Sequence, residues 1–249
     1  MTDEITVSSA EGVQTLRINR PAKKNAITDA MYRALADGLT AGEADPSIRV
    51  HVILGSAGVF TAGNDIADFL SVSEGARTDL QGLRFISLLP KVEKPIIAGV
   101  DGAAIGIGTT MLFHCDLVYA TPASTFATPF ADLGLVPEAA SSLLMPLRMG
   151  YARAFEMLAL GAIFTAERMR ETGLVNAIVA PEELEAAVLQ TAGALAKKPP
   201  EAIAMTRRLM RLGSDAIKER TEVEIVAFVE RLTSPEARRA FESFLTKRG

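Results

Sequence analysis

The chain has 249 residues, of which 49% are hydrophobic and 22% charged, as expected for a globular protein of one or two domains. Its formal net charge of −4 argues against a general nucleic-acid-binding protein. A single cysteine, Cys115, excludes an intrachain disulfide, and with only two histidines the chain offers no His/Cys metal site.

Targeting signals are not evident at either end of the chain. The first residues, MTDEITVSS (1–9), are acidic and polar, unlike a signal or transit peptide. The C-terminal TKRG is not an SKL-type peroxisomal address. No apolar run reaches the ~18 residues that a membrane span requires. We therefore expect a cytoplasmic protein with no metal and no cofactor of its own.

Short strands and helices alternate in the first half. VQTLRINR (13–20) alternates apolar and polar residues, as a half-buried strand does, and Pro21 ends it. ITDAMYRALADGLTAGEAD (27–45) has apolar residues at helical spacing, with Thr28 or Asp29 as N-cap. The remaining expected elements are buried strands at 50–57 and 95–102, a helix at 78–93, and a segment at 109–120 that begins as a helix and changes to a strand.

From residue 138 onward the pattern is mainly helical. The expected helices cover 138–149, 151–160, 165–172, 181–196, 200–213, 215–232 and 234–247, punctuated by glycine and proline. The KKPP run at Lys197–Pro200 is the best candidate hinge. We therefore predict an α/β protein with a core at 1–196 and a C-terminal helical region at 197–249.

Two glycine-containing turns each lead into a helix-like stretch. In DGAAIGIGTTM (101–111), Gly106 and Gly108 allow close backbone approach to a ligand, and the helix start leaves N–H groups unpaired. A dinucleotide-binding turn is the competing interpretation, but Met111 stands where its third glycine should be. A plain packing turn also fits. In FTAGNDIADFL (60–70), Gly63 makes the turn and Asn64 or Asp65 can cap the helix.

Glu138 lies in GLVPEAASSLL (134–144), downstream of both turns, among apolar neighbours in sequence. Backbone N–H groups at such turns can hold a developing oxyanion, and a carboxylate facing them can move a proton. A dry environment would bring the pKa of this carboxyl nearer to working pH. This combination indicates chemistry next to an acyl carbonyl. His114 and Cys115 are more consistent with core packing than with a nucleophilic pair.

Six segments together resemble the crotonase superfamily, also called the enoyl-CoA hydratase/isomerase family, over nearly the whole chain. They are RINRPAKKNAI (17–27), FTAGNDI (60–66), KPIIAGVDGAAIGIG (94–108), CDLVYA (115–120), STFATPFADLGLVPEAASS (124–142) and FTAERMRETGLVNAIV (164–179). The resemblance implies a crotonase-like spiral of ββα units with C-terminal helices that form a homotrimer, often a dimer of trimers. It also implies an acyl-CoA thioester as ligand.

The resemblance further implies roles for individual residues. The backbone N–H groups of Ala62 and Ile107 correspond to the family's oxyanion hole, although the family usually has glycine at the position of Ile107. The implied substrate- or CoA-binding residues are Arg20, Lys23, Lys24, Gly63, Asp65, Ile66, Gly106, Phe130, Phe244 and Lys247. Of these, Phe244 and Lys247 are expected to reach the CoA of a neighbouring subunit, and Phe130 to shape the acyl pocket.

The catalytic positions distinguish the subclass. The two glutamates that hold water in hydratases of the family correspond here to Thr110 and Phe130, neither of which is a base at neutral pH. The TPF…LG…PE…SS pattern is instead similar to peroxisomal-type Δ3,Δ2-enoyl-CoA isomerases, which use one glutamate corresponding to Glu138. Two alternatives remain open: another reaction of the family, such as hydration, hydrolysis or dehalogenation, and a non-catalytic acyl-CoA-binding subunit.

Overall fold

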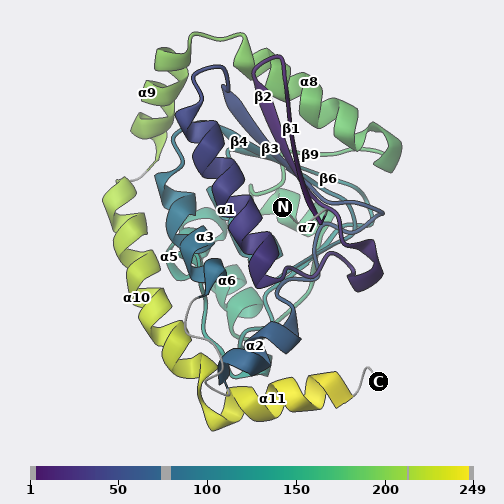
Figure 1. Cartoon of the computed structure of the whole chain (residues 1–249), viewed down its shortest axis with the longest axis vertical. Coiled ribbons are helices and arrows are strands. Elements are labelled where there is room, and N and C mark those ends of the chain that lie inside the picture. The colour runs from purple at the N-terminus through teal and green to yellow at the C-terminus, as the bar shows by residue number, and fades with distance from the viewer. Residues whose placement is uncertain (1–3, 74–79, 212, 247–249) are drawn as a thin grey trace.

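The computed structural model describes residues 4–73, 80–211 and 213–246 (Figure 1). Within these ranges the main sheet has the strand order β1-β2-β3-β4-β6-β9, antiparallel between β1 and β2 and parallel elsewhere. Its strands are β1 Ile5–Ala10, β2 Val13–Ile18, β3 Val50–Leu54, β4 Ile96–Val100, β6 Leu117–Ala120 and β9 Ala177–Ile178. A smaller sheet joins β5 Ala103–Ile105, β7 Thr125–Ala127 and β8 Phe164–Thr165. The α/β class predicted from the sequence is confirmed.

Helices surround both sheets. They are α1 Asp29–Ala44, α2 Ile66–Ser73, α3 Gln81–Leu88, α4 Ile107–Thr110, α5 Ser141–Met149, α6 Tyr151–Leu158, α7 Ala166–Glu171, α8 Leu184–Ala196, α9 Pro200–Met210, α10 Ser214–Leu232 and α11 Pro235–Thr246. Thr28 is the N-cap of α1, and its side chain accepts a hydrogen bond from the Met31 N–H at 3.4 Å. No helix in the described ranges is both long enough and apolar enough to cross a membrane.

The main sheet is covered on both faces, as a largely parallel sheet requires. In β3, Val52 and Leu54 pack with Val188 of α8 in one cluster. Ile53, which points the opposite way, belongs to the large cluster that includes Leu35 of α1. This alternation explains why 50–54 is buried throughout and why α1 and α8 lie on opposite sides of the sheet.

The C-terminal helices wrap around one side of this core. Figure 1 shows α10 running along the side of the molecule and α11 crossing its end next to α2. The rings of Phe228 in α10 and Phe241 in α11 lie 6.0 and 5.8 Å from the Phe69 ring in α2. The described part of the region 197–249 is therefore mainly helical, and its helices α10 and α11 pack onto α2 of the same chain.

Two predicted elements differ from the observed ones for local physical reasons. The predicted helix 78–93, whose first two residues lie outside the described ranges, is α3 followed by a 3₁₀ turn at Leu89–Lys91. The predicted helix 138–149 starts only at Ser141, because Ala139 and Ala140 have φ values of 56° and 54°. Glu138 therefore sits on a left-handed turn in front of α5. The strand β1 was not predicted.

Candidate active site

Glu138 faces a small cavity in the interior of the protein. The carboxyl is 4% exposed and lines a space of about 40 Å³ between α1, α2, α3 and α10. Most of the wall is apolar or aromatic, formed by Ile27, Tyr32, Phe69, Leu80, Leu83, Ile86 and Phe228, and the polar residues are Asp29, Asn64, Asp65 and Asp68. The apolar surroundings expected from the sequence neighbours of Glu138 are thus present in space.

Burial dominates the protonation of this carboxyl. It raises the pKa of Glu138 from 4.5 to about 8, a hydrogen bond from Thr110 opposes the shift, and the charge of Glu224 adds to it. A pKa near working pH is what a group that both accepts and returns a proton requires.

Thr110 and Phe130, the positions of the hydratase glutamates, have different surroundings here. The Thr110 hydroxyl donates a hydrogen bond to Glu138 Oε1. Phe130 is 4% exposed and lines a second, larger cavity. Thr110 thus orients the single carboxylate instead of contributing a second one.

The two predicted glycine turns adopt conformations that only glycine adopts readily. Gly63 has a φ of +86°, and a Cβ there would lie 2.7 Å from the Ile105 carbonyl oxygen. Gly106 has a φ of 57° and ψ of −119° and precedes α4. Ile107 is the first residue of α4, so its N–H has no acceptor within the helix.

The backbone hydrogen bonds correct the prediction for Ala62. The Ala62 N–H donates to the Lys24 carbonyl oxygen at 3.0 Å, so this amide is already occupied. Ile27 pairs with the neighbours of Asn64, since its N–H donates to Gly63 O at 2.8 Å and its carbonyl accepts from Asp65 N–H at 2.9 Å. Successive amides of an extended segment point to opposite sides, so the Asn64 N–H is directed away from Ile27.

Asn64 is therefore a site residue that the sequence alone did not reveal. Within the described ranges its N–H has no acceptor, and the residue lines both cavities. Its side-chain Oδ1 accepts a hydrogen bond from the Tyr32 hydroxyl at 2.5 Å. The donor is a backbone N–H, so the residue type at this position does not reveal it. Whether the N–H is left without an acceptor depends on Lys24 and Ile27, which are distant in sequence.

The larger cavity, of about 730 Å³, adjoins the small one through shared walls at Asn64, Asp65, Phe69 and Phe228. Most of the predicted ligand-binding residues contribute to its lining, as does Ala62: Lys23, Lys24, Gly63, Asp65, Ile66, Gly106, Phe130 and Phe244. Phe244 comes from α11 of the same chain, and its contact with the CoA of a neighbouring subunit stays a prediction. The site is thus a large groove with two lysines in its wall, next to a smaller cavity that Glu138 and Asn64 line.

Arg20 and Lys247 complete the predicted set. Arg20 does not line the cavity and forms ion pairs with Asp65 at 2.7 Å and Glu4 at 3.0 Å. Lys247 lies outside the described residues. The Asp65 carboxylate also accepts from the Ala67 N–H at 3.1 Å and so caps α2, as predicted. Arg20 thus braces the loop that carries Asn64 instead of facing the groove.

The other nucleophilic residue types are buried in the core. Burial raises the pKa of Cys115 to about 12 and lowers that of His114 to about 4. The neutral His114 ring donates from Nε2 to the Ala139 carbonyl at 2.7 Å. Within the described residues, no group of three or more His, Cys, Asp or Glu side chains is placed to hold a metal ion.

Comparison with known proteins identifies relatives of this architecture. The family model described as enoyl-CoA hydratase/isomerase matches residues 8–249. Enoyl-CoA delta isomerase 2 of Rattus norvegicus is 35% identical over 250 residues, which cover 98% of this chain but 64% of the rat protein, so the chain spans less than two thirds of that relative. Crotonyl-CoA hydratase of Syntrophomonas wolfei is 30% identical, with 99% of this chain and 96% of that protein covered.

A solved structure, that of Pseudomonas aeruginosa OdaA, superposes with a TM-score of 0.93 at 38% identity and covers 98% of this chain and 99% of its own. Agreement of this extent includes the main sheet, the smaller sheet and the C-terminal helices. The crotonase-type fold expected from the sequence is confirmed.

The burial of Glu138 predicts a pH-dependent stability difference between the wild type and Glu138→Gln. The folded-state pKa of Glu138, about 8, lies above the ordinary 4.5. The stability of the wild type is therefore highest below pH 4.5, and it is lost progressively as the pH rises from 4.5 through 8. A tenfold change in proton affinity corresponds to ~1.4 kcal/mol. At about pH 9 the free energy of unfolding of Glu138→Gln should therefore exceed that of the wild type by several kcal/mol. At about pH 5 the two proteins should unfold at similar urea concentrations.

Urea unfolding at a series of pH values measures this difference, with the exposed Glu230→Gln as the control that should follow the wild type throughout. Equal stability of Glu138→Gln and wild type at every pH would show that the carboxyl keeps an ordinary pKa.

Proposed function

The chain belongs to the enoyl-CoA hydratase/isomerase family, known as the crotonase superfamily, and from this premise we propose that it is a Δ3,Δ2-enoyl-CoA isomerase. The observation that carries the proposal is a buried carboxyl, Glu138, which lines one cavity together with Asn64. The backbone amides of Asn64 and Ile107 have no acceptor among the described residues. The 35% identity to a rat enoyl-CoA delta isomerase supports it.

In the proposed reaction one carboxylate performs both proton transfers. Glu138 removes a proton from C2 of a 3-enoyl-CoA, and the electrons of the broken C–H bond delocalise into a dienolate. Glu138 then returns the proton to C4, which leaves the double bond between C2 and C3. No water is consumed, in keeping with Thr110 and Phe130 at the positions that correspond to the water-holding glutamates.

The developing negative charge on the thioester oxygen needs fixed donors. We assign these to the Asn64 and Ile107 amides, in place of the Ala62 amide expected from the sequence. Loss of one such donor typically costs ~3–4 kcal/mol of transition-state stabilisation, so the loop geometry set by Gly63 and Gly106 matters as much as the carboxylate. The Tyr32–Asn64 hydrogen bond helps to hold that geometry.

The groove suits a CoA thioester in shape and charge. Lys23 and Lys24 lie at its wall and can meet the anionic nucleotide end, while Phe130, Leu133 and Phe244 offer apolar surface. A hydratase-like activity is the second candidate, favoured by the 30% identity to a crotonyl-CoA hydratase. Glu138 would then be the one carboxylate acting on water.

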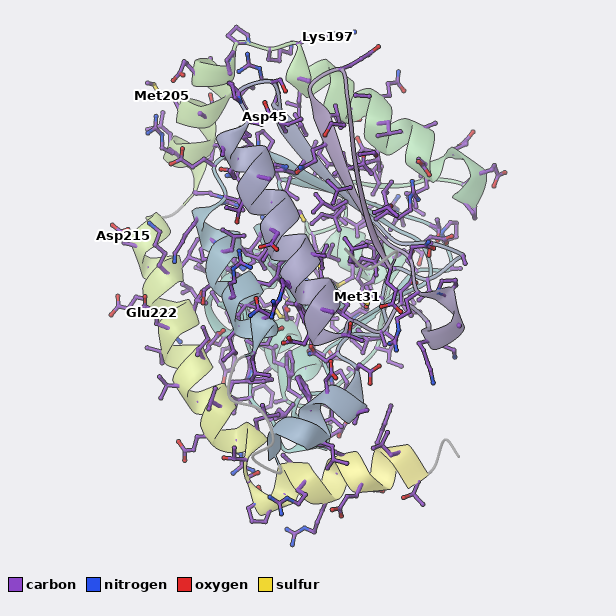
Figure 2. All side chains as sticks on the ribbon, viewed as in Figure 1. Met31, Asp45, Lys197, Met205, Asp215 and Glu222 are labelled. Carbon is purple, nitrogen blue, oxygen red and sulfur yellow. The ribbon has the colours of Figure 1, made fainter. Side chains whose placement is uncertain are left out.

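We also propose self-association as a homotrimer or a dimer of trimers. Large apolar side chains are exposed on α9 and α10, among them Leu209 at 82%, Met210 at 79% and Val226 at 71%. Figure 2 shows Met205 of α9 pointing away from the body of the molecule. Large apolar side chains exposed on two neighbouring segments support an interface between chains.

Glu138→Gln should abolish conversion of 3-enoyl-CoA to 2-enoyl-CoA while CoA-thioester binding is retained. The amide cannot accept the C2 proton, so kcat should fall by about 10²-fold or more. Turnover of 3-enoyl-CoA and hydration of 2-enoyl-CoA are measured in the same preparation, and binding by calorimetry. Normal isomerisation by the variant would exclude Glu138 as the base, and faster hydration than isomerisation in the wild type would favour the hydratase alternative.

Thr110→Val should move the pH dependence of kcat/KM upward. In the wild type kcat/KM should rise with pH and level off above about 8, as Glu138 loses its proton. The Thr110 hydrogen bond lowers that pKa, so without it the rise should occur at higher pH. Thr128→Val, which loses a buried hydrogen bond to the Met157 carbonyl, is the control and should leave the midpoint in place. A midpoint shared by both variants would contradict the role of Thr110.

Light scattering after size exclusion should give the mass of three or six chains. Leu209→Glu, which places a charge in the exposed apolar surface, should reduce this mass, whereas Lys197→Glu at an exposed loop should not. A wild-type mass of one chain at micromolar concentration would exclude the trimer.

A further inference from the structure

One face of α10 carries a carboxylate in the middle of a buried stripe. The residues Ile217, Thr221, Glu224, Phe228 and Leu232 recur at spacings of three and four, and all are buried. Glu224 is only 6% exposed. Figure 2 shows Glu222, two residues earlier, pointing away from the body of the molecule. Burial of an ionisable side chain in such a stripe destabilises the fold unless the side chain is paired. The position of Glu224 therefore indicates a specific role.

Glu224 caps α5 from outside that helix. Its Oε1 accepts a hydrogen bond from the Ser142 N–H at 2.9 Å. The residue at the N-cap of α5 is Ala140, which has no side-chain oxygen with which to do this. A carboxylate at this end also meets the positive end of the helix dipole. Glu224 Oε2 is buried and has no hydrogen-bond partner among the described residues.

The turn between Glu138 and α5 is strained and must be held. Ala139 and Ala140 have left-handed φ values of 56° and 54° and are fully buried. This conformation is unfavourable for a residue other than glycine. His114 donates to the Ala139 carbonyl at 2.7 Å from the core side, and Glu224 accepts from Ser142 on the α10 side. These two hydrogen bonds thus fix the turn that carries Glu138 from both sides.

We propose that Glu224 is a positioning residue for the reaction, which holds the turn that carries Glu138 and places a second negative charge beside it. The proposal rests on the proposed role of Glu138 as base. Helix α10 would then contribute two residues to the site, Glu224 and, one helical turn later, Phe228, which lines the same cavity as Glu138.

The charge of Glu224 has a definite sign of effect. Burial is the main reason for the raised pKa of Glu138, and the neighbouring Glu224 raises it further. The other ionisable groups facing the pair are Tyr32, Asp29, Asp65 and Asp68 at the cavity wall, and Arg220, one turn before Glu224, whose guanidinium lies 3.3 Å from Ser142 Oγ. Neutralising Glu224 should therefore allow Glu138 to lose its proton at a lower pH.

Three variants separate charge from capping. Glu224→Gln keeps an acceptor oxygen for Ser142 but removes the charge, and Glu224→Ala removes both. Glu222→Gln, an exposed position on the same helix, is the matched control. The titration of Glu138 is followed by the infrared band of its protonated carboxyl, assigned by its loss in Glu138→Gln, without substrate.

The expected result is an infrared midpoint that is lower in Glu224→Gln by about half a pH unit or more, with Glu222→Gln equal to the wild type. In isomerisation assays the midpoint of kcat/KM should move with it. Glu224→Ala should lower kcat about tenfold with a nearly unchanged KM, because the turn is no longer held.

An unchanged infrared midpoint in folded Glu224→Gln would overturn the proposal, and this variant decides the matter even if Glu224→Ala does not fold. Absence of isomerisation in the wild type would instead remove the proposed function, while the infrared midpoints would still show whether Glu224 controls the protonation of Glu138.

Discussion

The cost of keeping a carboxyl in an apolar recess is the constraint around which this site is arranged. A solvated glutamate would be almost fully ionised at neutral pH and would be a weak base. Burial of Glu138 between α1, α2, α3 and α10 raises its pKa to about 8, where the carboxyl can both take and return a proton. The surrounding contacts modulate this effect, since Thr110 stabilises the anion and Glu224 destabilises it.

The second requirement is donors whose position does not depend on side-chain motion. Backbone amides meet it, but only if the fold leaves them without an acceptor. Asn64 satisfies this because its loop pairs with Ile27 through the adjacent residues, and Ile107 because it begins a helix. The chain thus obtains two donors from the ordinary geometry of an extended segment and a helix end. Arg20, bonded to Asp65, fixes the loop.

Much of the architecture could be predicted from the sequence, because it follows from local patterns. Apolar spacing predicts the helix 27–45 and the buried strands at 50–57 and 95–102. Gly63 and Gly106 predict the two turns in which they lie. Glu138 was found as a lone carboxylate in an apolar stretch. The choice between the amides of Ala62 and Asn64 could not be made in this way, since it depends on Lys24 and Ile27, which are brought to the loop only by the tertiary fold. The start of α5 was misplaced for a related reason, because alanine does not signal a left-handed turn.

The C-terminal helices link the recess to the outside of the molecule. Phe228 of α10 and Phe244 of α11 line cavities whose other walls come mostly from residues 22–138, while residues of α9 and α10 on the outer side are apolar and exposed. An interface on that outer side would restrict the movement of α10, and therefore of Phe228 and Glu224. Because Glu224 accepts a hydrogen bond from Ser142 in the first turn of α5, such restraint would reach the turn of Glu138 through this one contact. Packing between chains and placement of the base would then be two consequences of the position of α10.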